Sequence, residues 1–180
     1  MGIILLILSL GCLSSATQEQ FLLKINSFTM ETFAVGKPQR NAYWDPRVMP
    51  SIRVCASTGI SYSRISQAAR YWEKAGYSFD GIRKDPLSTC MNARFGEIII
   101  TIPESGFADR HMASTRIYTR TKTGEIIKAK IQILPMNARK PRVLEHELGH
   151  ALGWMHYRQK FHIMHPTWFL GGYDRNGLSK

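Results

Sequence analysis

The alternation of apolar and polar residues along the chain predicts four β-strands. Residues 96–103 form a nearly continuous apolar run, which is typical of a strand buried on both faces. Residues 126–134 instead place apolar side chains at positions 127, 129, 131 and 133 with lysine or glutamine between them, which predicts a strand with one face in water. Further strands are expected at 52–55 and 113–120, and turns at 43–46 and 121–124.

Apolar residues at helical spacing predict two helices. The first covers residues 64–75, where apolar side chains recur every three or four positions. Ser61 or Ser63 is expected to cap its start. The second is expected to open at Pro141, where the missing N–H costs little. It is expected to end at Gly153, because glycine adopts the left-handed conformation after a helix without a steric penalty.

The second predicted helix carries the sequence HELGHALGWMH, from His146 to His156. Two histidines four positions apart share one face of a helix, so His146 and His150 can bind the same metal ion. The turn at Gly153 is expected to carry His156 back toward that ion as a third imidazole. Glu147, next to the first ligand, can reach a water molecule held by the metal. Three nitrogen ligands and one open position are typical of a catalytic zinc site.

A methionine, Met164, follows this motif in the sequence IMHP at 163–166. The pattern HExxHxxGxxH followed by a methionine turn marks the metzincin metalloproteases. Residues 44–170 resemble that clan, most of all its matrixin branch, which includes the matrix metalloproteinases and their bacterial relatives. The resemblance implies an α+β catalytic domain. Its parts are a twisted mixed sheet of about five strands, a long backing helix, an active-site helix and a short C-terminal subdomain after the third histidine.

The same resemblance implies roles for residues around the metal. Met164 is expected to lie beneath the three histidines as an apolar floor, and not to bind the ion. Pro166 and Trp168 match the wall of the pocket that receives the residue after the cut bond. The residues that would form an edge strand above the cleft, where an extended peptide adds as another strand, are Ala113, Ser114, Thr115 and Arg116. His162 and His165 are expected to be surface or packing histidines, because the ligand set is complete without them.

The N-terminus differs in composition from the rest of the chain. Residues 1–16 carry no charge and contain an apolar run that is too short to span a membrane, which is typical of a signal peptide. The protein is therefore expected to be secreted or periplasmic. Cys12 leaves a second interpretation open, a lipoprotein leader that anchors the protein to a membrane. Residues 17–40 would be an N-terminal arm or a short pro-segment, and residues 41–180 the catalytic domain.

Removal of the leader would leave two cysteines, Cys55 and Cys90. In an exported domain they either pair as a disulfide or remain two independent buried thiols. The net charge of +11 is concentrated before the second predicted helix. Such a charge favours acidic substrates or anionic surfaces, or simply keeps a solvated face soluble. No nucleic-acid motif accompanies it, and contact with a membrane is expected only if Cys12 is lipidated.

These observations predict an exported, monomeric zinc endopeptidase that uses Glu147 as general base on a protein or peptide substrate. The chief alternative is a catalytically idle, zinc-stabilised secreted binding protein on the same scaffold. Glu147 argues against it, because a structural site needs no base beside its ligand. A further alternative is an amidase or de-glycosylating hydrolase. One catalytic Zn²⁺ is the expected cofactor, and the sequence contains no convincing motif for a structural Ca²⁺ site.

Overall fold

The computed structural model describes residues 36–86, 90, 92–103 and 111–180. Residues 37–180 form one unit. The leader expected at 1–16, with Cys12, and nearly all of the arm or pro-segment expected at 17–40 lie outside the described residues. In the part of the chain that is described, no helix is long and apolar enough to cross a membrane.

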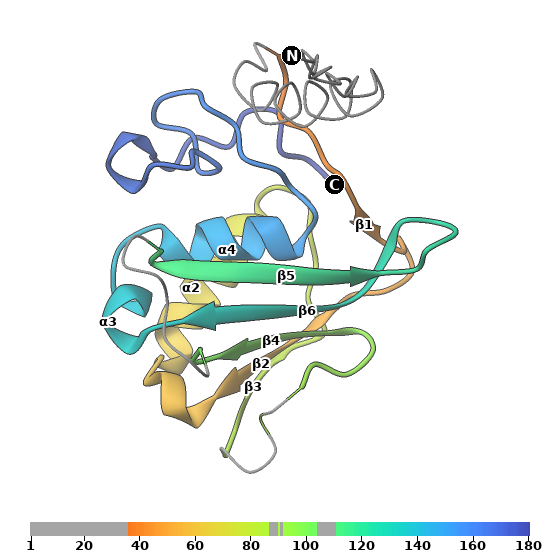
Figure 1. Ribbon diagram of the computed structural model, residues 1–180, viewed down its shortest axis with the longest axis vertical. Coiled ribbons are helices and arrows are strands. Elements are labelled where there is room, and N and C mark those ends of the chain that lie inside the picture. The colour runs from red at the N-terminus through yellow and green to blue at the C-terminus, as the bar shows by residue number, and fades with distance from the viewer. Residues whose placement is uncertain (1–35, 87–89, 91, 104–110) are drawn as a thin grey trace, which may run out of the picture. The chain divides into compact units, whose positions relative to one another are not determined.

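Six strands form one mixed sheet, in the order β1-β6-β4-β2-β3, with β5 also paired to β6. Every pairing is parallel except that of β5 with β6, which is antiparallel. The strand directions turn steadily from β3 to β5, so the sheet is twisted (Figure 1). The strands are β1 (Tyr43–Trp44), β2 (Ser51–Cys55), β3 (Ile82–Asp85), β4 (Glu97–Thr101), β5 (Ala113–Thr119) and β6 (Glu125–Ile133). The prediction of an α+β fold with a mixed sheet is confirmed.

Two local predictions about the strands were wrong, and one strand was missed. Tyr43 and Trp44, expected in a turn, pair with the start of β6 as a short strand. Strand β3 was not predicted at all. In β6, Ile126 is buried and Ile127 is only half-buried, the reverse of the expected alternation. The cause is an irregularity in the β5–β6 pairing, where Tyr118 lies opposite Lys128 and Thr119 opposite Ile126, so that Ile127 is skipped.

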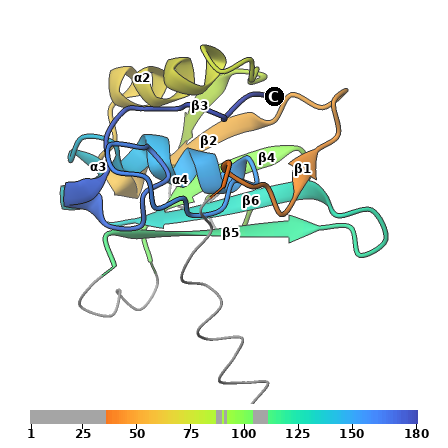
Figure 2. The ribbon, with the colours of Figure 1, turned by 90° about the horizontal axis from the view of Figure 1, so that it is seen from above.

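The two longer helices of the described residues, α2 and α4, cover one face of the sheet (Figure 2). Helix α2 (Tyr62–Glu73) begins and ends two residues earlier than the predicted 64–75, and of the two candidate caps it is Ser61 whose hydroxyl accepts a hydrogen bond from the backbone N–H of Arg64. Helix α4 (Val143–Ala151) packs against α2 and β5. The described residues also contain three short helical turns, η2 (Ala56–Thr58), α3 (Pro135–Ala138) and η4 (Trp168–Leu170).

The start of α4 differs from the prediction. Pro141 does not open this helix, which begins two residues later; Pro135 instead opens α3. The residue before α4 is Arg142, which has a positive φ of 71°. No glycine marks this position in the sequence, so the sharp turn into the helix carries no local signal.

The core lies between the sheet and the two helices. Ile52 and Ile98 of the sheet belong to the same hydrophobic cluster as Trp72 of α2 and Leu148 of α4, and all four side chains are fully buried. The indole N–H of Trp72 donates a hydrogen bond of 2.7 Å to the backbone oxygen of Glu145. This bond ties α2 to the first turn of α4 and so fixes the helix that carries the histidines.

The opposite face of the sheet holds a smaller cluster of Cys55, Cys90, Ala93 and Ile99. Cys55 and Cys90 form a disulfide, so the first of the two interpretations for these cysteines is correct. A disulfide is typical of proteins that fold outside the cytoplasm. It attaches the segment after β3 to the end of β2.

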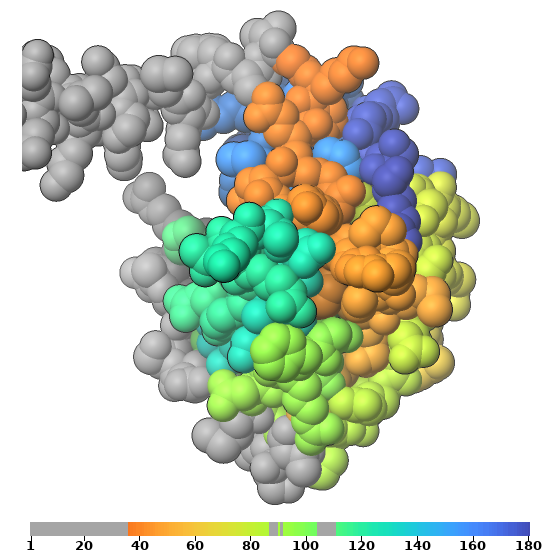
Figure 3. Space-filling model, turned by 90° about the vertical axis from the view of Figure 1, so that its right-hand side faces the viewer, coloured from red at the N-terminus to blue at the C-terminus, as the bar shows by residue number. Residues whose placement is uncertain are grey.

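The segment from Gln39 to Trp44 runs beside the turn that follows α4. Figure 3 shows it in orange between the β5–β6 turn and the C-terminal residues in dark blue. The backbone N–H of Asn41 donates to the oxygen of Gly153 at 3.0 Å, and the N–H of Met155 donates to the oxygen of Gln39 at 2.9 Å. These bonds hold the turn after α4, where the chain heads back toward His156.

Candidate metal centre

The three predicted ligands come together in space. Nε2 of His150 lies 3.0 Å from Nε2 of His146 and 3.1 Å from Nε2 of His156. Three nitrogens this close, with no acidic group between them, suit ligation of a single cation. Within the described residues, no Cys, Asp or Glu joins this group. The three histidines can therefore hold a metal ion.

Backbone carbonyls set the orientation of the two helical histidines. Nδ1 of His146 lies 2.7 Å from the oxygen of Ile163, and Nδ1 of His150 lies 2.7 Å from the oxygen of Trp154. A carbonyl only accepts, so each Nδ1 carries the proton and donates it. Each Nε2 then keeps its lone pair, directed toward the other ligands, as in known metal sites.

Burial keeps these two rings neutral. It lowers the pKa of His146 to about 4 and the pKa of His150 to about 3, because a charged imidazolium loses hydration in the interior. The neighbouring histidines lower both pKa values further. Neutral imidazole is the form that binds metal, so His146 and His150 are ready to bind at pH 7.

The turn that brings His156 back depends on Gly153. Helix α4 ends with Leu152 as its C-cap, and Gly153 follows with a positive φ of 96°, as predicted. A Cβ at Gly153 would lie 2.0 Å from the backbone oxygen of Ala42, which no real side chain tolerates. Both the backbone conformation and the close approach of segment 39–44 therefore require glycine here.

Glu147 follows His146 in helix α4 and is only 7% exposed. Burial raises its pKa to about 7, while a hydrogen bond from Thr115 acts in the opposite direction. The hydroxyl of Thr115 donates to Oε2 of Glu147 at 2.5 Å. A cation on the three histidines would lower this pKa again, because it favours the ionised carboxylate. In the absence of a cation, Glu147 is thus a buried carboxyl whose pKa lies near neutral pH.

Met164 is fully buried and lies against helix α4. A Cβ on Gly149 would lie 2.4 Å from its sulfur, so the helix and the methionine are in close contact. His162 and His165 are buried packing residues outside the ligand group, each accepting a backbone N–H through Nδ1. Sequence reasoning allowed a surface position for them, and that option is excluded.

Trp168 is held against the entrance of α4. Its indole N–H donates to the oxygen of Pro141 at 2.9 Å, and the guanidinium of Arg142 lies 5.1 Å from its ring centre. Arg142 also donates to the backbone oxygens of Trp168 and Gly171. Pro166 is exposed. Arg142 was not identified from the sequence. Its positive φ could not be predicted, because no glycine stands at this position.

Strand β5 lies at one edge of the sheet, alongside α4 (Figure 1). Among the described strands, only β6 pairs with it. The side chains of Ser114 and Arg116 are exposed, whereas Ala113 and Thr115 are half-buried toward the helix. An edge strand of this kind offers backbone groups to an added strand, but its sequence alone does not distinguish a binding edge from an ordinary one.

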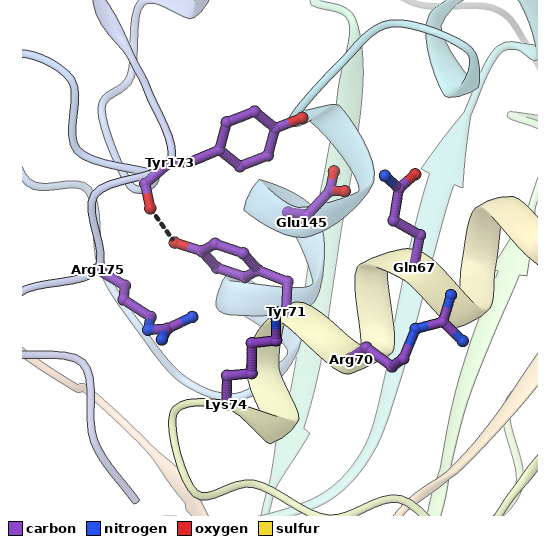
Figure 4. Close-up of a pocket in the computed structure, with 7 residues that line it drawn as sticks. All are labelled: Gln67, Arg70, Tyr71, Lys74, Glu145, Tyr173 and Arg175. Atoms are coloured by element: carbon purple, nitrogen blue, oxygen red, sulfur yellow. Dashed lines mark hydrogen bonds between the residues drawn. The ribbon is translucent and has the colours of Figure 1, made fainter.

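A separate pocket of about 240 Å³ lies between α2, the first turn of α4 and the C-terminal segment (Figure 4). Its wall includes Tyr71, whose hydroxyl donates to the backbone oxygen of Tyr173. Glu145 lines it too, but that carboxylate accepts hydrogen bonds of 2.7 and 2.8 Å from the guanidinium of Arg64. None of the three histidine ligands lines this pocket, so it is not an extension of the metal centre.

Comparisons with known proteins add no identification. No protein-family model matches the chain, and no curated protein matches it. What is established is an α+β domain with a mixed sheet, a disulfide and three histidines that can hold a metal ion.

Proposed function

We propose that this protein is an exported zinc-dependent endopeptidase of the metzincin type, similar to the matrixins. The observation that carries the proposal is the convergence of three imidazoles, two of them kept neutral by burial, without a fourth protein ligand among the described residues. A structural zinc site normally has four protein ligands, whereas a catalytic site keeps a position open. The disulfide between Cys55 and Cys90 supports export.

The donor set fits zinc. Imidazole nitrogens are common zinc ligands, and nitrogens bound tetrahedrally at 2.0–2.1 Å lie roughly 3.3 Å from one another. The distances of 3.0 and 3.1 Å between the Nε2 atoms come close to this value. When bound, zinc would lower the pKa of a coordinated water toward about 7 and polarise the scissile carbonyl.

Glu147 is the general base in this proposal. It accepts the proton of the attacking water and then delivers it to the departing amine. Burial raises the pKa of this carboxyl in the metal-free protein, and a cation on the histidines would lower it and so favour the ionised form that accepts a proton. Because Glu147 is only 7% exposed, bulk water has limited access to it.

The substrate would bind as an extended strand along the edge of β5. The backbone of residues 113–116 would pair with the peptide and place its scissile bond beside the histidines. Trp168 and Pro166 would line the pocket for the residue after the cut bond. The indole of Trp168, fixed by Pro141 and Arg142, gives that pocket a rigid apolar wall.

The test is incubation of the purified mature protein with a peptide library, with cleavage sites read by mass spectrometry. We expect internal cleavage that a chelator abolishes and that zinc restores. Glu147→Gln is expected to keep the metal and lose at least a hundredfold in kcat, since it removes the base. Glu73→Gln, an exposed acid-to-amide change on α2, is the matched control and is expected to leave kcat unchanged.

Two results would contradict the proposal. Zinc binding without any peptide cleavage would favour the idle binding protein. Undiminished cleavage by Glu147→Gln would remove the proposed base.

A further inference from the structure

The hydroxyl of Thr115 makes a direct contact with the proposed base. Its Oγ1 lies 2.5 Å from Oε2 of Glu147 and 3.2 Å from the backbone oxygen of the same residue. A hydroxyl has one proton and donates it to one acceptor at a time, so the shorter distance selects the carboxylate. A separation of about 2.5–2.7 Å is typical of a hydroxyl that donates to a charged oxygen.

Thr115 is held rigidly at this place. It lies in the middle of β5, opposite Ile131 of β6, which is fully buried in the core. Helix α4, which carries Glu147, packs directly against β5. Threonine is branched at Cβ and therefore has few side-chain rotamers on a strand. The sheet backbone, and not a flexible side chain, thus sets the position of the hydroxyl.

The hydrogen bond from Thr115 restricts the terminal torsion of the Glu147 side chain. The terminal torsion of a glutamate is broad, so burial alone does not fix where its two oxygens point. In the described part of the chain, Thr115 provides the side-chain hydrogen bond to this carboxylate. With Oε2 held by Thr115, Oε1 is the oxygen left to exchange a proton with a reactant.

We propose that Thr115 is a positioning residue for Glu147, whose hydroxyl holds Oε2 so that Oε1 performs the proton transfer. This inference rests on the proposed peptidase function. It assigns to the edge strand a second task besides pairing with a peptide: its backbone would hold the substrate, and one of its side chains would orient the base.

Two substitutions separate the hydroxyl from the shape of the side chain. Thr115→Val keeps the branched shape and removes the hydroxyl; Thr115→Ser keeps the hydroxyl. We expect Thr115→Val to lower kcat by roughly ten- to a hundredfold with KM within about twofold of the wild type, as for the loss of one hydrogen bond to a charged group. Thr115→Ser is expected to retain kcat within about threefold. Thr119→Val, an exposed position on the same strand, is the matched control and is expected to leave both constants unchanged.

Metal content and crystal structures of the zinc-loaded proteins supply a readout besides activity. Thr115→Val is expected to keep one zinc per chain, while its Glu147 carboxylate rotates or spreads over several positions. Three results would overturn the inference: a kcat of Thr115→Val within twofold of the wild type, an equal loss in Thr115→Ser, or loss of zinc or of folded protein in Thr115→Val.

The failure of the proposed function is a different result, namely a zinc-loaded wild type that cleaves no peptide. The inference then depends on the crystal structures alone. An equally ordered Glu147 carboxylate in the wild type and in Thr115→Val would contradict it.

Discussion

The two faces of the sheet both bury charged or titratable groups, but they arrange them in opposite ways. On the face away from the helices, Arg53 is fully buried and its guanidinium donates to both carboxylate oxygens of Glu97, at 2.9 and 2.6 Å. On the helix side, three imidazoles turn their Nε2 atoms toward one another. A fully matched set of donors and acceptors holds the fold together, whereas three imidazole nitrogens that converge on one point can hold a cation.

Arg53 and Glu97 also form hydrogen bonds to other residues on the face away from the helices. Arg53 also donates to the backbone oxygen of Asn92 at 2.7 Å, and Glu97 accepts from Arg83 and from the backbone N–H of Arg94. Burial by itself would raise the pKa of Glu97, but these bonds outweigh it and the pKa is lowered. The hydrogen bonds that Glu97 accepts thus stabilise its charged form and offset its burial.

The largest expected effect comes from breaking the matched cluster. Arg53→Met would leave Glu97 buried without its main partner, and we expect a loss of about 3–5 kcal/mol in the free energy of unfolding, measured by urea denaturation. Arg47→Met is the control, because its ion pair with Asp45 leaves the arginine side chain 89% exposed and exposed pairs contribute at most about 1 kcal/mol. Equal losses in the two variants would contradict the contrast between the clusters. Metal binding is expected to survive in both.

Removal of the disulfide on the same face is expected to cost slightly less. It links residues 35 positions apart, and closing such a loop stabilises by about 3–4 kcal/mol on the chain-entropy model. The double variant Cys55→Ser, Cys90→Ser should lose that amount in urea denaturation. It should still bind one metal ion, because neither cysteine belongs to the histidine cluster. Loss of metal in this variant would show that the two faces depend on each other.

A change near the histidines is expected to act on both stability and metal affinity. Gly153→Ala forces an alanine into positive φ and against the oxygen of Ala42, at a cost of about 1–3 kcal/mol, and it displaces the turn that carries His156. We therefore expect weaker zinc binding in titration calorimetry. Gly124→Ala is the control: its φ is also positive, at 72°, but a Cβ there meets nothing. It should lose about 1 kcal/mol and keep its zinc affinity, and equal affinities in the two variants would contradict the role of Gly153.

The smallest expected effect is a difference in pH dependence between the two faces of the sheet. His146 and His150 have pKa values lowered from 6.5, so below that pH the unfolded chain binds more protons and stability falls on acidification. Glu147, whose pKa is raised, has the opposite slope, so the metal-free protein is best studied in the Glu147→Gln background. There we expect a loss of roughly 1–2 kcal/mol between pH 6.5 and about pH 5.5.

Substitutions of histidines identify which side chains cause this pH dependence of stability. Replacing His146 and His150 by glutamine should flatten most of it, and His162, whose pKa burial also lowers, accounts for the remainder. His111→Gln, at an exposed position, should change nothing. The contribution of Glu97 should disappear only at more acidic pH, because its folded-state pKa lies below the ordinary value of 4.5. A wild-type slope in the double histidine variant would refute the assignment.

The sequence predicts the regular parts of this domain well, because those parts depend on local patterns. Within the run at 96–103, residues Glu97–Thr101 form a strand buried throughout, and Ser61, one of the two expected caps, caps its helix. The spacing of His146, His150 and His156 and the glycine before the third histidine were enough to predict that the three rings meet. Helical periodicity and the conformational freedom of glycine are local properties, and both can be read without knowledge of the tertiary structure.

The features that were missed depend on contacts between distant segments. Strand β3 is mostly exposed and lacks an apolar pattern, so only its pairing with β2 makes it a strand. Ile126 and Ile127 are equally apolar, and the irregular pairing with β5 determines which of the two is buried. The link from Thr115 to Glu147 joins residues 32 positions apart, and nothing in either segment marks it.

The most direct measurement is a crystal structure of the zinc-loaded protein, with anomalous scattering at the zinc edge. We expect one ion per chain, bound by Nε2 of His146, His150 and His156 at about 2.0–2.1 Å, with its remaining position open to solvent. An ion bound by a fourth protein side chain, or one that leaves His156 unbound, would contradict the catalytic metal site.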